Sequence, residues 1–127
     1  MDFEGFKLIY SYSRKQAIED GLLLDCTAQA KDSGFTLHTV VTDNLYHGFI
    51  APPAGLEGEG QSVEGRLHDV LWMVLDAARK QPNSSRVETD VLFLMAPARQ
   101  EKVRVVAVVG PGDEGEPVLT IMLPGDD

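Results

Sequence analysis

The feature that most constrains this chain is a long amphipathic segment, from Val63 to Lys80, followed by three short β-type segments. Its apolar side chains recur every three or four residues, which places them on one face of an α-helix. That face comprises Leu67, Val70, Leu71, Val74, Leu75 and Ala78. Trp72 and Met73 widen it, so we expect the helix to be buried on more than one side. Such a helix must pack against another layer of structure.

The segments after this helix predict that layer. Apolar, β-branched side chains dominate residues 91–95, 102–109 and 118–123, and the joins APARQ and GPGDEGE have hairpin length. We therefore predict an α+β fold in which a C-terminal three-stranded antiparallel meander packs on one long helix. Both faces of the predicted strands are apolar at their middles, so helices should cover one face and another element the other.

Short N-terminal strands and helices complete the predicted fold. Each predicted helix follows a residue that can accept hydrogen bonds from the helix's first N–H groups, namely Ser13, Asp25 or Thr42. The first should span residues 14–20, the second should end at Lys31, and the third should be one or two turns long. Gly21 and Gly34 suit the left-handed position that closes a helix. Extended segments are expected at 7–10, 22–25 and 35–41.

Size and composition predict one cytoplasmic domain over residues 1–127. The chain is 43% hydrophobic, enough for a single core, and residues 51–61, rich in proline, glycine and glutamate, read as a surface loop. A lone cysteine, Cys26, excludes an internal disulfide and fits a reducing compartment. The N-terminus does not resemble a signal peptide, and no apolar run is long enough to span a bilayer.

Charge is the strongest functional signal. Twenty acidic residues against eleven basic ones give a net charge of −9, and residues 110–127 carry five acids and no base. These five are Asp113, Glu114, Glu116, Asp126 and Asp127. Such a surface repels nucleic acid and favours a protein partner with a basic surface. The alternative is that the acidity only keeps the protein soluble.

Tyr12 and Arg14 are further candidates for the partner-binding surface, within the polar cluster SYSRKQ. The simpler role of this cluster is to cap and orient the first helix.

Catalytic and metal signatures are weak. His68 and Asp69 are adjacent on the long helix and therefore point about 100° apart, and no nucleophile context accompanies them. His38, His47, His68 and Cys26 lack metal-ligand spacing, so we predict neither a metal nor a cofactor. The alternative function is an enzyme or small-ligand binder with a cleft around Tyr12, Arg14, His68, Asp69 and Trp72.

Four segments taken together carry a family resemblance: IYSYSRKQAIEDGLLLD, residues 34–42, GRLHDVLWMVLDAAR and GPGDEGEPVLTIMLPGDD. In this order they resemble a family of small bacterial proteins of unknown function found on plasmids and integrative elements. The resemblance implies genes carried beside conjugation and antirestriction functions.

Together these observations favour an accessory protein that binds another protein. The best candidate activity is inhibition of a host defence or DNA-processing complex, of the anti-CRISPR or antirestriction type, including mimicry of DNA by carboxylates. A homodimer formed through the uncovered face of the sheet is a further alternative.

Overall fold

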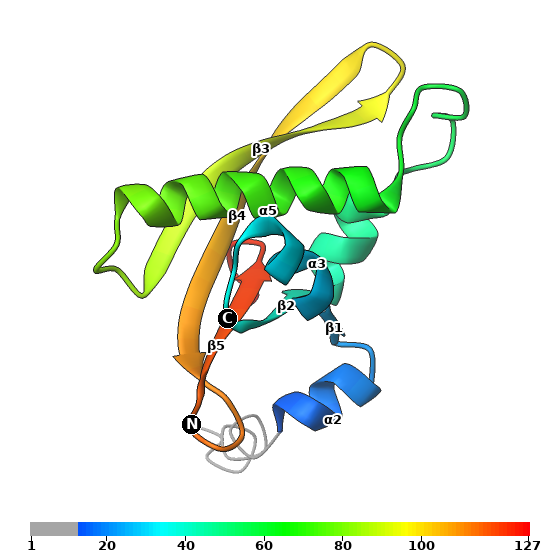
Figure 1. Cartoon of the computed structure of the whole chain (residues 1–127). Helices are drawn as coiled ribbons and strands as arrows, with labels where there is room; N and C mark the ends of the chain where they lie inside the picture. Colours follow the sequence, from blue (N-terminus) through cyan, green and yellow to red (C-terminus); the bar gives the residue numbers. More distant parts are fainter. Residues whose placement is uncertain (1–12) are drawn as a thin grey trace.

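A five-stranded sheet organises the protein in a computed structural model, which describes residues 13–127 (Figure 1). The strand order is β1-β2-β5-β4-β3. The strands are β1 (Leu23–Asp25), β2 (His38–Thr42), β3 (Arg86–Ala96), β4 (Arg99–Pro111) and β5 (Pro117–Met122). The α+β class is confirmed, and β3, β4 and β5 form the predicted antiparallel meander. The sheet is larger than predicted, because two N-terminal strands extend it.

The extension depends on a parallel pair, β2 with β5, in which His38 is opposite Val118 and Val41 is opposite Ile121. Strand β1 then pairs antiparallel with β2. Parallel neighbours require a long crossover, and here it runs through most of the chain. Strand β5, close to the C-terminus, therefore lies in the middle of the sheet, between β2 and β4. The predicted strand at 7–10 lies outside the described residues.

The helices are α2 (Arg14–Glu19), α3 (Thr27–Ser33), α4 (Asp43–Leu45), the π-helix η1 (Tyr46–Ile50) and α5 (Val63–Lys80). Helix α5 has the predicted bounds, and it begins where the Ser62 hydroxyl accepts a hydrogen bond from the Gly65 N–H. None of the helices in the described part of the chain has the length and hydropathy needed to cross a membrane.

The predicted helix ends are confirmed in part. Thr42 Oγ1 accepts from the N–H of Leu45, as predicted, and Gly34 closes α3 with a left-handed φ of 112°. The prediction for Asp25 was wrong by one residue, because Cys26 is the N-cap of α3. The Asp25 carboxylate still accepts a hydrogen bond from the Thr27 N–H, at 2.9 Å.

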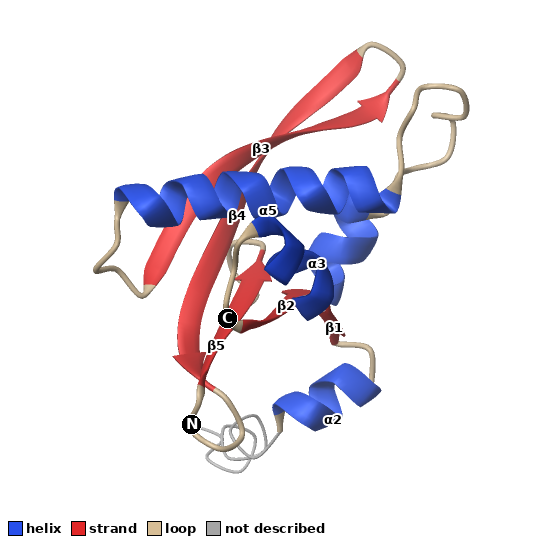
Figure 2. Ribbon diagram, viewed as in Figure 1, coloured by secondary structure: helices blue, strands red, loops and turns tan. Residues whose placement is uncertain are grey.

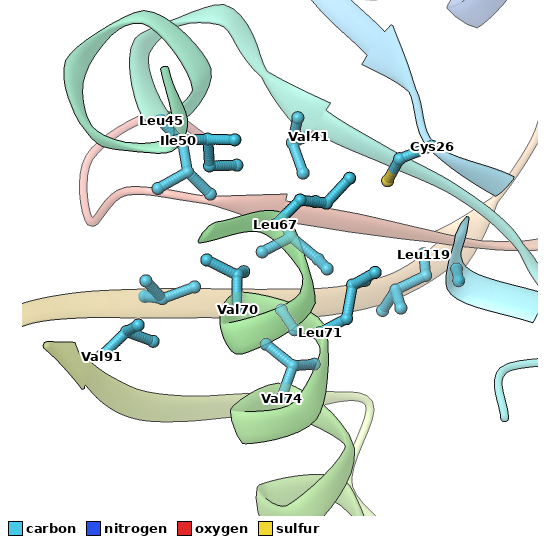
Figure 3. Close-up of a cluster of buried hydrophobic side chains, with 14 of the residues drawn as sticks. Cys26, Val41, Leu45, Ile50, Leu67, Val70, Leu71, Val74, Val91 and Leu119 are labelled. Atoms are coloured by element: carbon cyan, nitrogen blue, oxygen red, sulfur yellow. The ribbon is translucent and has the colours of Figure 1, made fainter. Parts of the chain in front are cut away.

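The core lies between α5 and one face of the sheet (Figure 3). Val70, Leu71 and Val74 of α5 are almost fully buried, together with Val91 of β3 and Ile121 of β5. Burying each such side chain contributes roughly 2 kcal/mol to stability. Both α3 and η1 pack against this same core, so most of the helical structure lies on one side of the sheet.

Helix α2 covers part of the opposite face. Strand side chains alternate between faces, and Leu119 and Ile121 point into the core. Thr120 therefore points the other way, and it accepts a hydrogen bond from Arg14 of α2. Helix α2 thus lies apart from the other helices, next to the turn between β4 and β5 (Figure 2).

One buried arginine, Arg66, connects the N-terminal part of α5 to three neighbouring segments. Arg66 of α5 is only 3% exposed, and its guanidinium donates to the carbonyls of Phe49 and Leu94, both at 2.8 Å. It also donates to the side chain of Gln61 and lies over the ring of Phe93. It forms no ion pair within residues 13–127. Arg66 therefore joins η1, the loop at 51–62 and β3 to α5.

Candidate functional site

A cleft of about 380 Å³ lies between α2, β2 and the β4–β5 turn. It combines basic and acidic groups that come from opposite ends of the chain. Its lining residues are Arg14, Lys15, Ile18, His38, Asp113, Glu114, Glu116 and Val118. The sequence predicted three of these acids and Arg14 as partner-binding residues, and the structure brings those four together. We refer to this feature as the α2 cleft.

A residue of the β4–β5 turn caps the N-terminus of α2. Asp113 Oδ1 accepts from the N–H of Arg14 at 2.7 Å, and Oδ2 accepts from the N–H of Lys15 at 3.0 Å. Ser13 Oγ accepts from the next N–H, that of Gln16, as the capping prediction required. The first N–H groups of a helix have no partner within the helix, so these three bonds satisfy them. The hydrogen bonds from Lys15 and Arg14 hold the pKa of Asp113 below its usual range.

Replacing Asp113 with asparagine should loosen α2. A depressed carboxyl pKa stabilises the folded state above the unfolded value of about 3.9, and this stability is lost as pH falls through the lower folded pKa. We expect amide exchange of Arg14 and Lys15 to be several-fold faster in Asp113→Asn at pH 6, and the difference to shrink as pH falls below the ordinary carboxyl pKa of about 3.9. Glu114→Gln is the control, and equal exchange in both variants at pH 6 would contradict this role.

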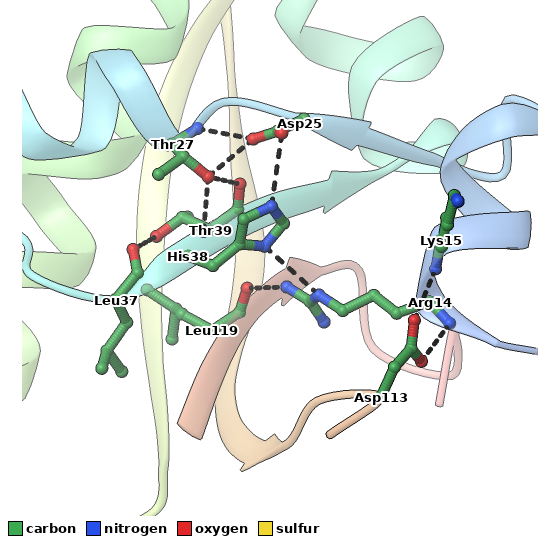
Figure 4. Close-up of polar contacts among 9 residues, drawn as sticks. All are labelled: Arg14, Lys15, Asp25, Thr27, Leu37, His38, Thr39, Asp113 and Leu119. Atoms are coloured by element: carbon green, nitrogen blue, oxygen red, sulfur yellow. Dashed lines mark hydrogen bonds and ion pairs between the residues drawn. The ribbon is translucent and has the colours of Figure 1, made fainter. Parts of the chain in front are cut away.

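The Arg14 side chain lines the α2 cleft and reaches His38 and the backbone of Leu119 (Figure 4). Its guanidinium donates to Thr120 Oγ1 at 2.9 Å and to the backbone carbonyl of Leu119 at 2.8 Å. Burial lowers the pKa of Arg14, and the negative charges of Asp113 and other carboxylates oppose that shift. An arginine still keeps its proton at every physiological pH. Arg14 is thus a fixed, half-buried positive charge.

His38 links this charge to Asp25. The Arg14 Nε lies 3.4 Å from His38 Nδ1, and His38 Nε2 lies 3.3 Å from Asp25 Oδ2. An arginine can only donate, so Nδ1 must be the acceptor and the neutral ring carries its proton on Nε2. Both ring nitrogens are therefore engaged. Neither is free to take a proton from a substrate in this arrangement.

Asp25 is ionised within this chain of contacts. Burial by itself would raise the pKa of Asp25. Hydrogen bonds from the side chain and N–H of Thr27, with the hydrogen bond of His38, outweigh burial and hold that pKa below its usual range.

The two acids at the end of the chain lie elsewhere. Asp126 accepts from Thr42 Oγ1 at 2.8 Å and from the Asn44 amide at 3.0 Å. Asp127 pairs with Arg86 at 2.8 Å. These two carboxylates hold the C-terminal segment against β2, α4 and β3, and they do not line the α2 cleft.

Glu114 and Glu116 differ from the other three C-terminal acids. Both side chains are exposed at the rim of the α2 cleft, and neither forms an ion pair with any residue in 13–127. The turn that carries them is closed by a hydrogen bond from the Gly112 N–H to the Glu116 carbonyl, at 2.6 Å. Their charges remain available to a partner.

The residues proposed for the alternative cleft do not line one common cleft. His68 and Asp69 are exposed on α5, 3.8 Å apart, whereas Arg14 lies on the opposite face of the sheet. His68 lines a cleft beside α3, and Asp69 and Trp72 line another beside β3. Tyr12 lies outside the described residues. The described chain contains no group of three or more histidine, cysteine, aspartate or glutamate residues arranged to hold a metal.

A family comparison matches the entire chain. The family is described as "Family of unknown function (DUF6573)", and the match covers residues 1–127. The chain belongs to this family. No curated protein and no solved structure matches it.

The contacts of His38 with Arg14 and Asp25 are not apparent in the sequence, where His38 is a candidate metal ligand and Asp25 a candidate helix cap. The alternation of residues 38–41 does place His38 on the face opposite Val41. Its neighbours could not be named without the parallel register of β2 and β5.

Cys26 is predicted to be inert. Its side chain is buried, and burial raises the pKa of the thiol to about 12. At pH 8 only about one thiol in ten thousand is then the reactive thiolate. We expect a disulfide reagent at pH 8 to label native protein at least ~100-fold more slowly than protein unfolded in guanidinium. Complete labelling of native protein within minutes would contradict this.

Proposed function

We propose that this protein works by binding a protein partner with a basic surface, and that Glu114 and Glu116 at the rim of the α2 cleft make the main contact. The observation that carries the proposal is that the five C-terminal acids fall into two groups, those bound within the protein and those exposed to solvent. Asp113, Asp126 and Asp127 are bound within the protein, whereas Glu114 and Glu116 are exposed and unpaired among the described residues.

The overall charge supports this proposal. A net charge of −9 attracts cationic surfaces and speeds their encounter, and the two free carboxylates set where the contact forms. Such contacts weaken with salt, because exposed charges are screened over about 8 Å at physiological ionic strength.

The contacts of His38 in the α2 cleft also favour binding over catalysis by a histidine. Its one imidazole, that of His38, has both nitrogens engaged, by Arg14 and Asp25. The Arg14 guanidinium is itself held by Thr120 and Leu119. A general base needs a nitrogen or oxygen within hydrogen-bond reach of the substrate, and these contacts occupy both nitrogens of this imidazole.

The best target class is a host defence or DNA-processing complex. Proteins that handle nucleic acid carry basic channels, and exposed carboxylates can occupy such a channel by the same attraction that draws phosphates. An accessory role on mobile DNA, which the resemblance of the sequence implies, fits this target class.

Affinity capture from a bacterial extract tests the proposal. Tagged wild-type protein should retain a basic partner at low salt and less of it at moderate salt, as identified by mass spectrometry. The double variant Glu114→Lys, Glu116→Lys should retain at least ~tenfold less, because four units of charge change at the contact. The control is Glu57→Lys, Glu59→Lys, which makes the same change of charge on the exposed loop at 51–62.

Two outcomes would overturn the proposal. Equal loss in both double variants would mean that only the overall charge matters, and full retention in both would remove the acidic turn from the contact.

A second candidate function is binding of a small ligand in the α2 cleft. The observation that favours it is the cleft volume of about 380 Å³ next to the half-buried charge of Arg14. Mass spectrometry of protein purified under native conditions should then detect a bound anionic metabolite, which Arg14→Gln would release.

A further inference from the structure

A second cleft, of about 300 Å³, lies where α5 crosses the outer edge of β3. The structure leaves few large apolar side chains exposed, yet two of them, Trp72 at 55% and Leu92 at 57%, line this one cleft. Its other lining residues are Asp69, Met73, Asp90 and Val91. Exposed apolar side chains at the edge of a sheet offer a partner an apolar surface to contact. We refer to it as the Trp72 cleft.

The strand beside this cleft has a free edge. Strand β3 is eleven residues long and pairs only with β4, and no strand of residues 13–127 lies on its other side. Alternate residues of an edge strand point their N–H and C=O groups outward, where another strand can bind them. Proteins usually shorten or cover such edges. Here the edge is long and carries the exposed Leu92.

The chemistry of the Trp72 cleft selects a cation. Asp69 and Trp72 are three residues apart on α5 and so share one helix face at the cleft. Asp90 lies on the face of β3 opposite Val91, where its Oδ1 accepts from Arg104 at 2.8 Å, so Asp69 is the carboxylate beside the indole. The face of an indole attracts an ammonium or guanidinium group, and flanking carboxylates strengthen that attraction.

We infer that the outer edge of β3 binds an extended basic segment of a partner protein. The backbone of that segment pairs with β3, and one of its lysine or arginine side chains enters the Trp72 cleft. The aliphatic stem lies on Met73, and the charged end lies on Trp72 beside Asp69. The proposed function shares with this site only the basic character of the partner, so either can fail without the other.

A second copy of this chain fits the edge less well. A twofold pairing of β3 with itself would bring the Trp72 clefts of both copies together. Asp69 of one copy would then approach its equivalent, in a protein that already carries a charge of −9. Like charges placed opposite one another destabilise such a pairing. Charge complementarity therefore favours a basic strand.

Trp72 allows a direct test, because it is the only tryptophan of the chain and its fluorescence reports this cleft alone. The probe is a capped heptapeptide of alternating valine and threonine with a central arginine. We expect a saturable change in emission, and at least ~fivefold weaker binding when citrulline replaces the arginine. Methylation of alternate backbone nitrogens on the paired edge should abolish binding, because it removes the strand contacts.

Variants locate the charge contact. Asp69→Asn should weaken binding of the arginine peptide about threefold. Asp76→Asn, on the same helix but paired with Lys80 and outside the cleft, should leave it unchanged. The Glu114→Lys, Glu116→Lys variant should bind the peptide as wild type does, which separates this site from the α2 cleft.

Three results would overturn the inference. Equal binding of the arginine and citrulline peptides would remove the cation from the contact. Unchanged binding after backbone methylation would remove the strand pairing. A change of emission with protein concentration alone, together with a dimer in sedimentation, would assign the edge to a second copy.

Discussion

Replacing Arg66 with alanine should lower the free energy of unfolding by about 3 kcal/mol. The substitution removes the donors that satisfy the part-buried carbonyls of Phe49 and Leu94, and it leaves a void under Phe93. Each unsatisfied buried group costs about 1–3 kcal/mol. For a domain of this size the melting temperature should fall by roughly 12 °C, measured by circular dichroism.

Lysine should restore little of this loss, because an ammonium group cannot reproduce the planar fork that reaches η1 and β3 together. The matched control is Arg79→Ala, an exposed arginine at the other end of α5, which should change stability by no more than about 0.5 kcal/mol. If Arg66→Ala lowered the free energy of unfolding by less than about 1 kcal/mol, the contacts of Arg66 would not be what holds η1 and β3 to α5.

Replacing Ile121 with alanine should cost about 4 kcal/mol. Ile121 is fully buried in β5, the strand that joins β2 on one side to β4 on the other. The cavity would open where the N-terminal strands meet the meander, so β1 and β2 should lose protection from hydrogen exchange first. Urea unfolding measures the loss of stability, and hydrogen exchange locates it.

Leu22→Ala is the control for this cavity, because Leu22 is 47% exposed and its truncation should cost under about 0.5 kcal/mol. If Ile121→Ala were as mild as this control, the parallel junction of β2 and β5 would not be part of the cooperative core.

Features with a local cause were predictable from the sequence. Helix α5 follows from spacing within the segment itself, and its bounds were confirmed. The caps at Ser13 and Thr42 and the left-handed Gly34 also depend only on neighbouring residues. The antiparallel meander follows because short turns join its strands.

Features with a distant cause were not predictable. The pairing of β2 with β5 joins segments about eighty residues apart, and no turn sets its register. The same holds for Asp113, which caps a helix that begins 99 positions earlier, and for Asp126, which reaches Thr42 across 84 positions. The sequence shows that a carboxylate is present, but only the fold shows which hydrogen-bond donors lie next to it.

The structure therefore sharpens the electrostatic hypothesis. Composition presented five C-terminal acids as equivalent, but three of them have partners inside the protein. A mutation at Asp113 would disturb α2 and the partner contact together, so it cannot test binding. Glu114 and Glu116 can be changed without breaking any ion pair of the described residues.

The most direct test is the salt dependence of the dissociation constant, measured by calorimetry on the captured partner and the purified protein. The account predicts that affinity falls steeply between 50 and 300 mM salt, roughly tenfold or more, and that Glu114→Lys, Glu116→Lys removes most of this dependence. Affinity that is independent of salt, or an equal dependence in wild type and variant, would contradict it.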